Sequence, residues 1–526
     1  MEFGIDPALK IYSGGLGYLA GSHMRSAHDL KQNMIGIGML WKLGYYDQIR
    51  DANSTMKVLS RERYYSFLQP TDLIFPVVIN GHEVKVQAFY LAPEVFGTVP
   101  MYLLTTDREE MNDYLSCTIT HHLYDNNAAA RIAQSIVLGI GGAKVVEALG
   151  GADIYHMNEA HALPLAFHLY DKFGAVKEVN KRLVFTTHTP VRAGNEERDI
   201  NLLNKMGFFG DVPLETVREI THHEENDNFG YTPAALALAK KANGVSQLHA
   251  KVSEDMWKGV KGKPEIIGIT NAQNQAFWQD KAYKAALDAD DDKALLERKR
   301  EMKKELFRII ADQTGKIFDP NLLTIVWARR FAAYKRADLI MRDHTRFYEL
   351  LDRAKEPIQV IWAGKPYPQD DYAVDLFNRL IHLTRLSHTS TIVTGYEMDL
   401  SAALKKGSDI WLNTPRRPME ASGTSGMTAA MNGSVNFSVN DGWIPEFAKH
   451  GHNSFVLPEA DTTQSVDVQD DQDYHHLMRI LTDEIIPTYY KKPKKWLEIV
   501  KNSAKEVVPA FDSDRMAGEY YDRLFS

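Results

Sequence analysis

The sequence has very little cysteine, since Cys117 is the only one among 526 residues. A single cysteine cannot form an internal disulfide or a cysteine-based zinc site, and a reducing compartment is the natural setting for such a chain. No uninterrupted apolar run reaches the roughly 18 residues that a membrane helix needs. The first residues also lack the basic start and apolar core of a signal peptide. We therefore expect a cytoplasmic protein that does not span a membrane.

An excess of positive charge is also missing. Lys and Arg total 61 and Asp and Glu total 69, so the formal net charge is −8, and nucleic acid is not an expected partner. Hydrophobic residues make up 44% and charged residues 25% of the chain. These ordinary values exclude a disordered, collagen-like or disulfide-scaffold protein. At about 150 residues per domain, the length predicts two large domains or several smaller ones.

What the chain does contain is an alternation of short apolar runs with longer helical patterns. The runs expected to be strands are 183–187, 324–328, 358–363, 391–394 and 410–413. This alternation is typical of βαβ units in a parallel sheet, whose ligands bind at the carboxyl ends of the strands. The densely charged stretch from 288 to 313 is interpreted as a solvated helix that joins two α/β lobes.

Two clusters could hold an anion. In Tyr12-Ser13-Gly14-Gly15-Leu16-Gly17, glycines before a helix let backbone N–H groups approach a negative charge, although a tight turn is the more frequent meaning of such a pattern. The full dinucleotide fingerprint is absent, so NAD binding is not favoured. The second cluster is a run of cations directly after the strand at 324–328, namely Arg329, Arg330, Lys335 and Arg336. A phosphate would pair with such cations, and an exposed charged surface is the alternative.

A third cluster, 413–433, follows the strand expected at 410–413. At its centre, Glu420-Ala421-Ser422-Gly423-Thr424-Ser425 places a carboxylate before a loop of small residues that opens a helix. The carboxylate can accept sugar hydroxyls while nearby N–H groups hold an anion. A helix capped by Ser422 or Thr424 is the alternative, but the order of residues is too particular for a cap alone.

These clusters resemble the α-glucan (glycogen/maltodextrin) phosphorylase family in its short bacterial form. Four shorter segments extend the resemblance in the same order: 185–190, 243–246, 269–271 and 363–365. The resemblance implies an α/β protein with the GT-B fold, which has two Rossmann-like lobes and an active site in the cleft between them. It implies an N-terminal lobe over 1–268, a C-terminal lobe over 269–500 that includes the charged helix, and a C-terminal helix over 501–526 that packs back on the first lobe.

The resemblance also implies roles for single residues. Arg330 and Lys335 would bind the substrate phosphate, and His188 would contact the sugar. Glu420 and the backbone of Ser422 and Gly423 would hold the sugar hydroxyls, so that Arg330, Lys335, Glu420 and His188 form the expected catalytic set. Further expected contacts to substrate are Gly14, Gly15, Gly17, Asn271 and Tyr334, and the expected contacts to a cofactor or nucleotide phosphate are Arg329 and Thr424.

One position departs from the family pattern in a way that bears on chemistry. Eight residues after the glutamate, at position 428 here, phosphorylases carry the lysine that forms a Schiff base with pyridoxal phosphate. This chain has Thr428 there, and threonine has no amine. We therefore expect no covalent pyridoxal phosphate at Thr428.

Three functions stay open on this basis. The first is a retaining α-1,4-glucan phosphorylase whose pyridoxal phosphate binds without a covalent link, through Arg329, Gly423 and Thr424. The second is a nucleotide-sugar-dependent glucosyltransferase that holds the diphosphate on Arg330 and Lys335. The third is a glucan-binding pseudoenzyme, which would need fewer of these phosphate ligands. The expected partners are accordingly an α-1,4-glucan or malto-oligosaccharide with phosphate, a sugar phosphate or a nucleotide sugar.

Smaller departures are Ala272 and Tyr367, where the family usually has glycine and histidine. The chain also begins immediately before Glu2-Phe3, so we expect a shortened or missing central strand. No metal site is expected, because the histidines of His222-His223-Glu224-Glu225 lack the i,i+4 spacing of a helical zinc pair. A homodimer stays open, since the family often forms dimers.

Overall fold

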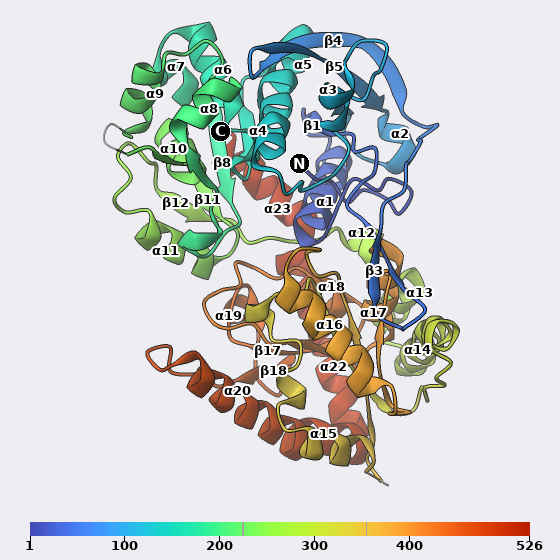
Figure 1. Ribbon diagram of the computed structural model, residues 1–526. Coiled ribbons are helices and arrows are strands. Elements are labelled where there is room, and N and C mark those ends of the chain that lie inside the picture. The colour runs from blue at the N-terminus through green and yellow to red at the C-terminus, as the bar shows by residue number, and fades with distance from the viewer. Residues whose placement is uncertain (224–225, 354) are drawn as a thin grey trace. The chain divides into compact units, whose positions relative to one another are not determined.

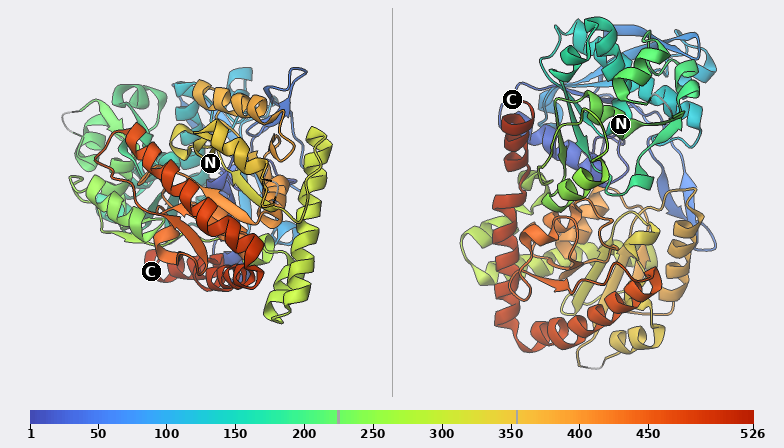
Figure 2. Two further views of the ribbon diagram at one scale, coloured as in Figure 1. Left: turned by 90° about the horizontal axis from the view of Figure 1, so that it is seen from below. Right: turned by 90° about the vertical axis from the view of Figure 1, so that its left-hand side faces the viewer.

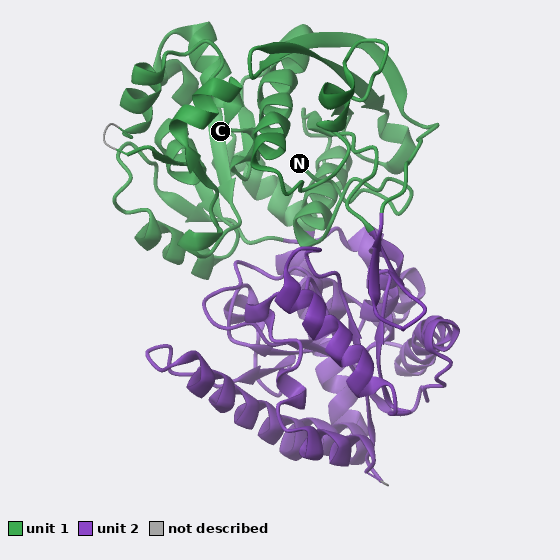
Figure 3. Cartoon of the chain, in the orientation of Figure 1, with its two compact units in different colours: residues 1–46, 60–271, 513–526 green, residues 47–59, 272–512 purple. Residues whose placement is uncertain are grey.

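The computed structural model describes residues 1–223, 226–353 and 355–526 (Figure 1). The chain divides into two compact units (Figure 3). Unit 1 comprises Met1–Tyr46, Ser60–Asn271 and Ser513–Ser526, and unit 2 comprises Asp47–Leu59 and Ala272–Asp512. Both contain parallel sheets flanked by helices, which confirms the α/β class. The boundaries differ from the expected 268 and 500, and 47–59, expected in the first lobe, belongs to unit 2.

Unit 1 contains two larger sheets. The first has the strand order β1-β6-β5-β4 and is mixed. Its strands are β1 (Gly36–Met39), β4 (Gln69–Ile79), β5 (His82–Leu91) and β6 (Met101–Thr105). The second has the order β12-β11-β8-β7 and is parallel throughout. Its strands are β7 (Tyr155–Asn158), β8 (Leu183–Thr187), β11 (Lys241–Gly244) and β12 (Ile266–Gly268).

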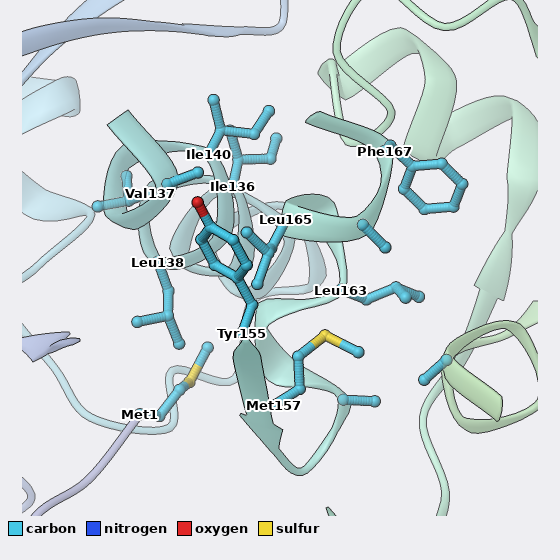
Figure 4. Packing of buried hydrophobic residues seen from close by; sticks show 14 of the residues in the cluster. Met1, Ile136, Val137, Leu138, Ile140, Tyr155, Met157, Leu163, Leu165 and Phe167 are labelled. Carbon is cyan, nitrogen blue, oxygen red and sulfur yellow. The ribbon is translucent and has the colours of Figure 1, made fainter. Parts of the chain in front are cut away.

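A long apolar helical stretch forms the centre of unit 1. It runs through α4 (Ala128–Ile136), the π-helical turn η1 (Val137–Gly141) and α5 (Gly142–Ala148). Figure 4 shows side chains of this stretch beside residues of β7 and of α6 (Pro164–Phe173). Within the described residues this is the one helix long and apolar enough to cross a membrane, and 78% of its apolar 18-residue window is buried inside the protein. A buried apolar helix in a protein core has the same length and composition as a membrane-spanning one.

The last residues of the chain pack within unit 1. Helix α23 (Ser513–Glu519) lies against α1 (Gly15–Asp29), where the hydroxyls of Ser513 and Ser26 are 2.6 Å apart. Tyr520 follows α23, and its hydroxyl accepts a hydrogen bond from Asn243 Nδ2 at 3.1 Å. These buried contacts tie the end of the chain to both α1 and the parallel sheet.

Unit 2 is built on a parallel sheet with the strand order β15-β14-β13-β16-β17-β18. Its strands are β13 (Leu323–Ala328), β14 (Ile358–Ala363), β15 (Ser390–Val393), β16 (Ile410–Asn413), β17 (Val435–Val439) and β18 (Ser454–Leu457). All are fully buried or nearly so, as expected of strands covered by helices on both faces. The five strands predicted from sequence, including β8 of unit 1, are confirmed to within one residue at each end.

The helices of unit 2 include α14 (Asp292–Thr314), α17 (Met398–Gly407), α18 (Ser425–Met431) and α22 (Pro493–Phe511). Helix α22, red in Figure 2, packs against α18. The charged stretch is helical as predicted, but α14 packs against α17 as part of unit 2 and is not a separate linker. Its Lys303 forms a buried ion pair with Asp409, with 2.5 Å between Nζ and Oδ2.

The hairpin of β2 (Asp47–Arg50) and β3 (Met56–Leu59) also belongs to unit 2. Gln48, which is buried, donates a hydrogen bond to Gly364 O at 2.9 Å and accepts one from Gly395 N at 3.1 Å. Both glycines lie just after strands of the parallel sheet, so these bonds place the hairpin at the carboxyl ends of β14 and β15.

Candidate active site

The residues selected from sequence fall into two groups, one in each unit. Those in unit 2 are Arg329, Arg330, Tyr334, Lys335, Glu420, Ser422, Gly423, Thr424 and Thr428. Those in unit 1 are Gly14, Gly15, Gly17, His188 and Asn271.

In unit 2, Glu420 lies between two cations. Its Oε2 atom is 3.0 Å from Lys335 Nζ and 3.2 Å from Arg329 Nη1. Burial raises the pKa of Glu420, but the charges of Lys335 and Arg329 more than offset this effect, and the pKa lies below its usual value. Glu420 is therefore an ionised hydrogen-bond acceptor that is buried together with its counter-ions.

Backbone contacts at the strand ends position Arg329 and Glu420 for this pairing. Arg329 directly follows β13, and the backbone N–H of Glu420 donates to Asp441 Oδ2 at 2.9 Å. Gly364 follows the neighbouring strand β14 with φ of 149°, and a Cβ there would lie 1.8 Å from Arg329 O. Only glycine permits this close approach of the two strand ends.

Arg336 has a different role from the rest of the cation run. Its side chain is buried, pairs with Asp470 at 2.9 Å and Asp473 at 2.6 Å, and donates to the carbonyls of Thr414 and Pro415. Each of its three side-chain nitrogens therefore donates a hydrogen bond within unit 2. The expectation that four neighbouring cations share one anion is wrong for Arg336, whose contacts are structural.

The other members of the cation run stay near Glu420. Arg330 is exposed, and its charge lowers the pKa of Glu420 further. Lys335 Nζ lies 5.2 Å from the centre of the Tyr334 ring. Thus Arg330, Tyr334 and Lys335 lie on one short segment after β13, beside the carboxylate.

Helix α18 begins after Thr424. Thr424 is the N-cap residue, but its side chain makes no capping hydrogen bond, so the simple helix-cap alternative does not account for it. Thr428 is fully buried, and its hydroxyl donates to Ser425 O at 3.1 Å. The position where the family resemblance expects an amine is thus occupied by a short hydroxyl that bonds back to its own helix.

Several buried polar atoms at this edge lack hydrogen-bond partners within the described residues. They are Arg329 Nε, Asn413 Oδ1 and Ser422 Oγ. Buried polar atoms are nearly always hydrogen-bonded, so we expect a ligand or water to bond to these three atoms. A donor of Arg329 and a hydroxyl of Ser422 fit the oxygens of a phosphate-bearing group, whether pyridoxal phosphate or a nucleotide.

In unit 1, His188 lies just after β8. Its Nε2 lies 2.6 Å from Asn158 Oδ1, the amide oxygen of the residue that ends β7. Burial and the nearby His249 lower the pKa of His188 to about 3. The ring is therefore neutral at pH 7, donates Nε2–H to Asn158, and presents Nδ1 as an acceptor.

Glu159 supports the His188 loop. Its carboxylate accepts hydrogen bonds from the backbone N–H of His188 and from Thr189 Oγ1, the latter at 3.2 Å. Burial raises its pKa despite these bonds. Its φ of 69° is unusual for a residue with a Cβ, and such strain is concentrated at functional sites.

The glycine loop of unit 1 is organised by Glu2, a residue that sequence reasoning missed. The Glu2 carboxylate accepts from Ser13 N at 2.6 Å, Gly14 N at 3.2 Å and the Tyr124 hydroxyl at 2.7 Å. A Cβ on Gly17 would lie 2.7 Å from Glu2 Oε2. The Gly14 N–H is thus bonded within unit 1, and Gly17 is required for close packing.

The remaining expectations also concern unit 1. Helix α1 begins at Gly15, so only Gly14 precedes the helix, whereas Gly15 and Gly17, which were expected before it, lie in its first turn. Asn271 is buried, and its Oδ1 atom has no hydrogen-bond partner among the described residues. His222 adopts the left-handed conformation at the end of a helix, while Glu224 and Glu225 of the histidine-rich segment lie outside the described residues.

Comparison with known proteins gives the family. The family model for carbohydrate phosphorylase matches residues 272–486. The chain is 32% identical, over its full length, to maltodextrin phosphorylase of Thermococcus litoralis, of which it covers 70%. It is 30% identical over its full length to glycogen phosphorylase of Aquifex aeolicus, covering 85% of that protein. An uncharacterized protein of Methanocaldococcus jannaschii is 47% identical over 100% of this chain and 98% of its own.

The chain therefore belongs to the carbohydrate phosphorylase family, as the resemblance of its sequence clusters indicated. The region matched by the family model lies in unit 2 and contains the Glu420, Arg329 and Lys335 cluster.

Proposed function

We propose that this protein is a retaining α-glucan glucosyltransferase that transfers the terminal glucose of an α-1,4-glucan to inorganic phosphate. The observation that carries the proposal is the ionised Glu420 between Lys335 and Arg329 at the carboxyl ends of β13 and β16. Membership of a family that includes a maltodextrin and several glycogen phosphorylases supports it.

In the proposed reaction, Lys335 and Arg330 hold the attacking phosphate. A phosphate oxygen forms a bond to C1 of the terminal glucose, the C1–O4 glycosidic bond breaks, and the proton carried by the attacking phosphate passes to the departing oxygen. The products are glucose 1-phosphate and a glucan shortened by one unit. Fixed cations stabilise the charge that develops in such a step because they need no reorganisation.

Each unit offers an acceptor for hydroxyl groups. Glu420 of unit 2 would accept hydrogen bonds from glucose hydroxyls, and the neutral His188 of unit 1 would accept a hydrogen bond from a glucan hydroxyl through Nδ1. Arg329, Thr424 and Gly423 would hold the phosphate of pyridoxal phosphate. When bound, this group would supply acid and base chemistry through its phosphate beside the substrate phosphate.

A nucleotide-sugar-dependent glucosyltransferase is the second candidate, and Thr428 is the observation that favours it. Its hydroxyl cannot form a Schiff base with an aldehyde, so no pyridoxal group linked at this position would compete with a nucleotide. The diphosphate would then take the place of phosphate at Arg330 and Lys335. This candidate predicts elongation of glucan and not its breakdown.

A donor panel separates the two candidates. The purified protein is incubated with a malto-oligosaccharide and either phosphate, glucose 1-phosphate, ADP-glucose or UDP-glucose, each with and without pyridoxal phosphate. Phosphate-dependent release of glucose 1-phosphate is the expected result. Nucleotide release with elongation would overturn it in favour of the second candidate, and no product in any reaction would favour a glucan-binding protein without catalysis.

A further inference from the structure

A turn after β17 contacts the loop that carries Glu420. The turn comprises residues 441–443, and the Glu420 loop comprises residues 420–423. β17 pairs in parallel with β16, and each segment follows the carboxyl end of its strand. The carboxyl ends of neighbouring parallel strands meet at one edge of a sheet, which brings the two segments together.

The turn holds two backbone groups of the Glu420 loop. The buried side chain of Asp441 accepts the N–H of Glu420 through Oδ2 and the N–H of Gly442 through Oδ1, each at 2.9 Å. The Trp443 N–H donates to the Ser422 carbonyl at 3.0 Å. The loop is therefore fixed at the residue that bears the ionised carboxylate and again two residues later.

Gly442 permits this close approach. Its φ is 63°, and a Cβ there would lie 2.2 Å from Ser422 O. Since that oxygen belongs to the backbone, any larger residue must displace the turn or the loop. Gly451 has a similar φ of 70°, but a Cβ there would meet no atom within 4 Å. The two glycines therefore share a left-handed backbone and differ in their contact with the Glu420 loop.

The turn is anchored in the core of unit 2. The buried Trp443 ring stacks on that of Phe447, the last residue of α19 (Ile444–Phe447), with centroids 4.8 Å apart. It also makes an edge contact with Phe511 of α22, again at 4.8 Å. Aromatic pairs of this geometry are favourable beyond the burial of their surface. The Glu420 loop is thus hydrogen-bonded to a turn that packed side chains hold in place.

Asp441 uses only acceptor oxygens in these contacts. Burial raises its pKa to about 7, so a neutral carboxyl is present at neutral pH. The amide of an asparagine is neutral too and keeps one acceptor oxygen. Asp441→Asn can therefore keep the hydrogen bond to the Glu420 N–H, whereas Asp441→Ala cannot.

We propose that Asp441 is a positioning residue for Glu420, which it holds by the backbone so that the carboxylate lies ready to accept sugar hydroxyls. The inference rests on the proposed function, because phosphorolysis is the reaction that a displaced Glu420 would slow. Asp441 acts only through Glu420 and takes no part in making or breaking bonds. The effect of removing Asp441 should therefore shrink when Glu420 is already altered.

A double-mutant cycle tests this dependence. Asp441→Ala should lower kcat/KM for phosphorolysis by about 30- to 100-fold, since a displacement of about 1 Å can cost that much. Asp441→Asn should recover most of this loss. In the Glu420→Gln background, Asp441→Ala should cause a much smaller further loss. The same fold-loss in both backgrounds, or an Asn variant as slow as the Ala variant, would overturn the proposal.

The two glycines give a matched test that leaves every side chain of the site in place. Gly442→Ala should lower kcat/KM as Asp441→Ala does, because its Cβ would displace the Ser422 carbonyl. Gly451→Ala adds comparable backbone strain away from the Glu420 loop, and its kcat/KM should equal that of wild type. Equal activity of the two variants, whether high or low, would overturn the proposal.

Hydrogen–deuterium exchange separates this inference from the proposed function. Exchange is measured for peptides containing Glu420 in full-length wild type, Asp441→Ala and Asp441→Asn. Faster exchange is expected in Asp441→Ala alone, with or without phosphorolytic activity. If wild type releases no glucose 1-phosphate, the proposed function fails, and this exchange pattern decides the positioning role. Unchanged exchange in Asp441→Ala would overturn the positioning role and leave the proposed function to the donor panel.

Discussion

The carboxyl edges of the two parallel sheets carry different kinds of polar group. In unit 1, His188 is neutral, and the nearby Glu159 carboxyl, whose pKa is raised by burial, accepts hydrogen bonds from the backbone N–H of His188 and from Thr189 Oγ1. In unit 2, Glu420 is ionised between Lys335 and Arg329. The same strand-to-loop architecture therefore offers a neutral surface suited to hydroxyls in one unit and an ionic one suited to phosphate in the other.

The largest expected effect is the loss of an ionic group in unit 2. Lys335→Ala should lower phosphorolysis by about 1000-fold or more, because it removes a preorganised cation from the attacking phosphate. Glucan binding should change little. Initial rates of glucose 1-phosphate release and glucan affinity check both statements, with exposed Lys304→Ala of α14 as the control. Unchanged phosphorolysis would remove Lys335 from its proposed role.

A substitution of Arg336 tests whether this cation stabilises the fold and does not bind a ligand. Arg336→Met should lower the free energy of unfolding by about 3–5 kcal/mol, because Asp473 would lose its charged partner inside unit 2. Asp470 would keep Arg416, which pairs with it at 2.6 Å. Urea unfolding measures the change, and exposed Lys449→Met serves as the control. Stability equal to that of wild type would contradict the buried pairing.

Glu420→Gln keeps the shape of the side chain but removes its charge. Transition-state stabilisation should fall by about 2–4 kcal/mol, the cost typical of losing one preorganised polar contact. The ratio of wild-type to variant kcat/KM measures this. A fully active variant would defeat both enzyme mechanisms considered for this site.

Asp441 provides a pH-dependent test of the surroundings of Glu420. Burial raises the pKa of Asp441 to about 7 from 3.8 in the unfolded chain. The folded protein therefore binds this proton more tightly, and the stabilisation is complete below pH 3.8 and lost as pH rises through 7. Between about pH 4 and 7 the unfolding free energy of Asp441→Asn should fall less with pH than that of wild type. Parallel pH dependences would contradict the burial of this carboxyl.

The smallest expected effect concerns the neutral edge of unit 1. Since the pKa of His188 is about 3, its protonation should contribute no change in kcat/KM between pH 5 and 7. The pH dependence of kcat/KM should have the same shape in wild type and His188→Asn, although the values themselves differ. A limb near pH 6 that disappears in the variant would show that His188 titrates in the working range.

Local sequence patterns predicted much of the fold and selected several residues of the candidate site. β8 and the strands of unit 2 were predicted because a buried parallel strand is a continuous apolar run. Glu420 and Lys335 were found because their segments carry distinctive residue orders. In the sequence Arg336 is a cation of the same run as Lys335. Its structural role could not be predicted, because only the fold brings Asp470 and Asp473 to it.

Other functional candidates depend on contacts between distant segments. The role of Glu2 at the glycine loop requires the chain to bring it beside Ser13 and Gly14.

Calorimetric titration tests the comparison of the two edges most directly. Inorganic phosphate and glucose 1-phosphate are titrated separately into wild type, Lys335→Ala and His188→Asn. The account predicts that Lys335→Ala loses affinity for both ligands, whereas His188→Asn binds inorganic phosphate as wild type does. Undiminished phosphate binding by Lys335→Ala, or its loss in His188→Asn, would contradict the assignment of phosphate to the ionic edge of unit 2.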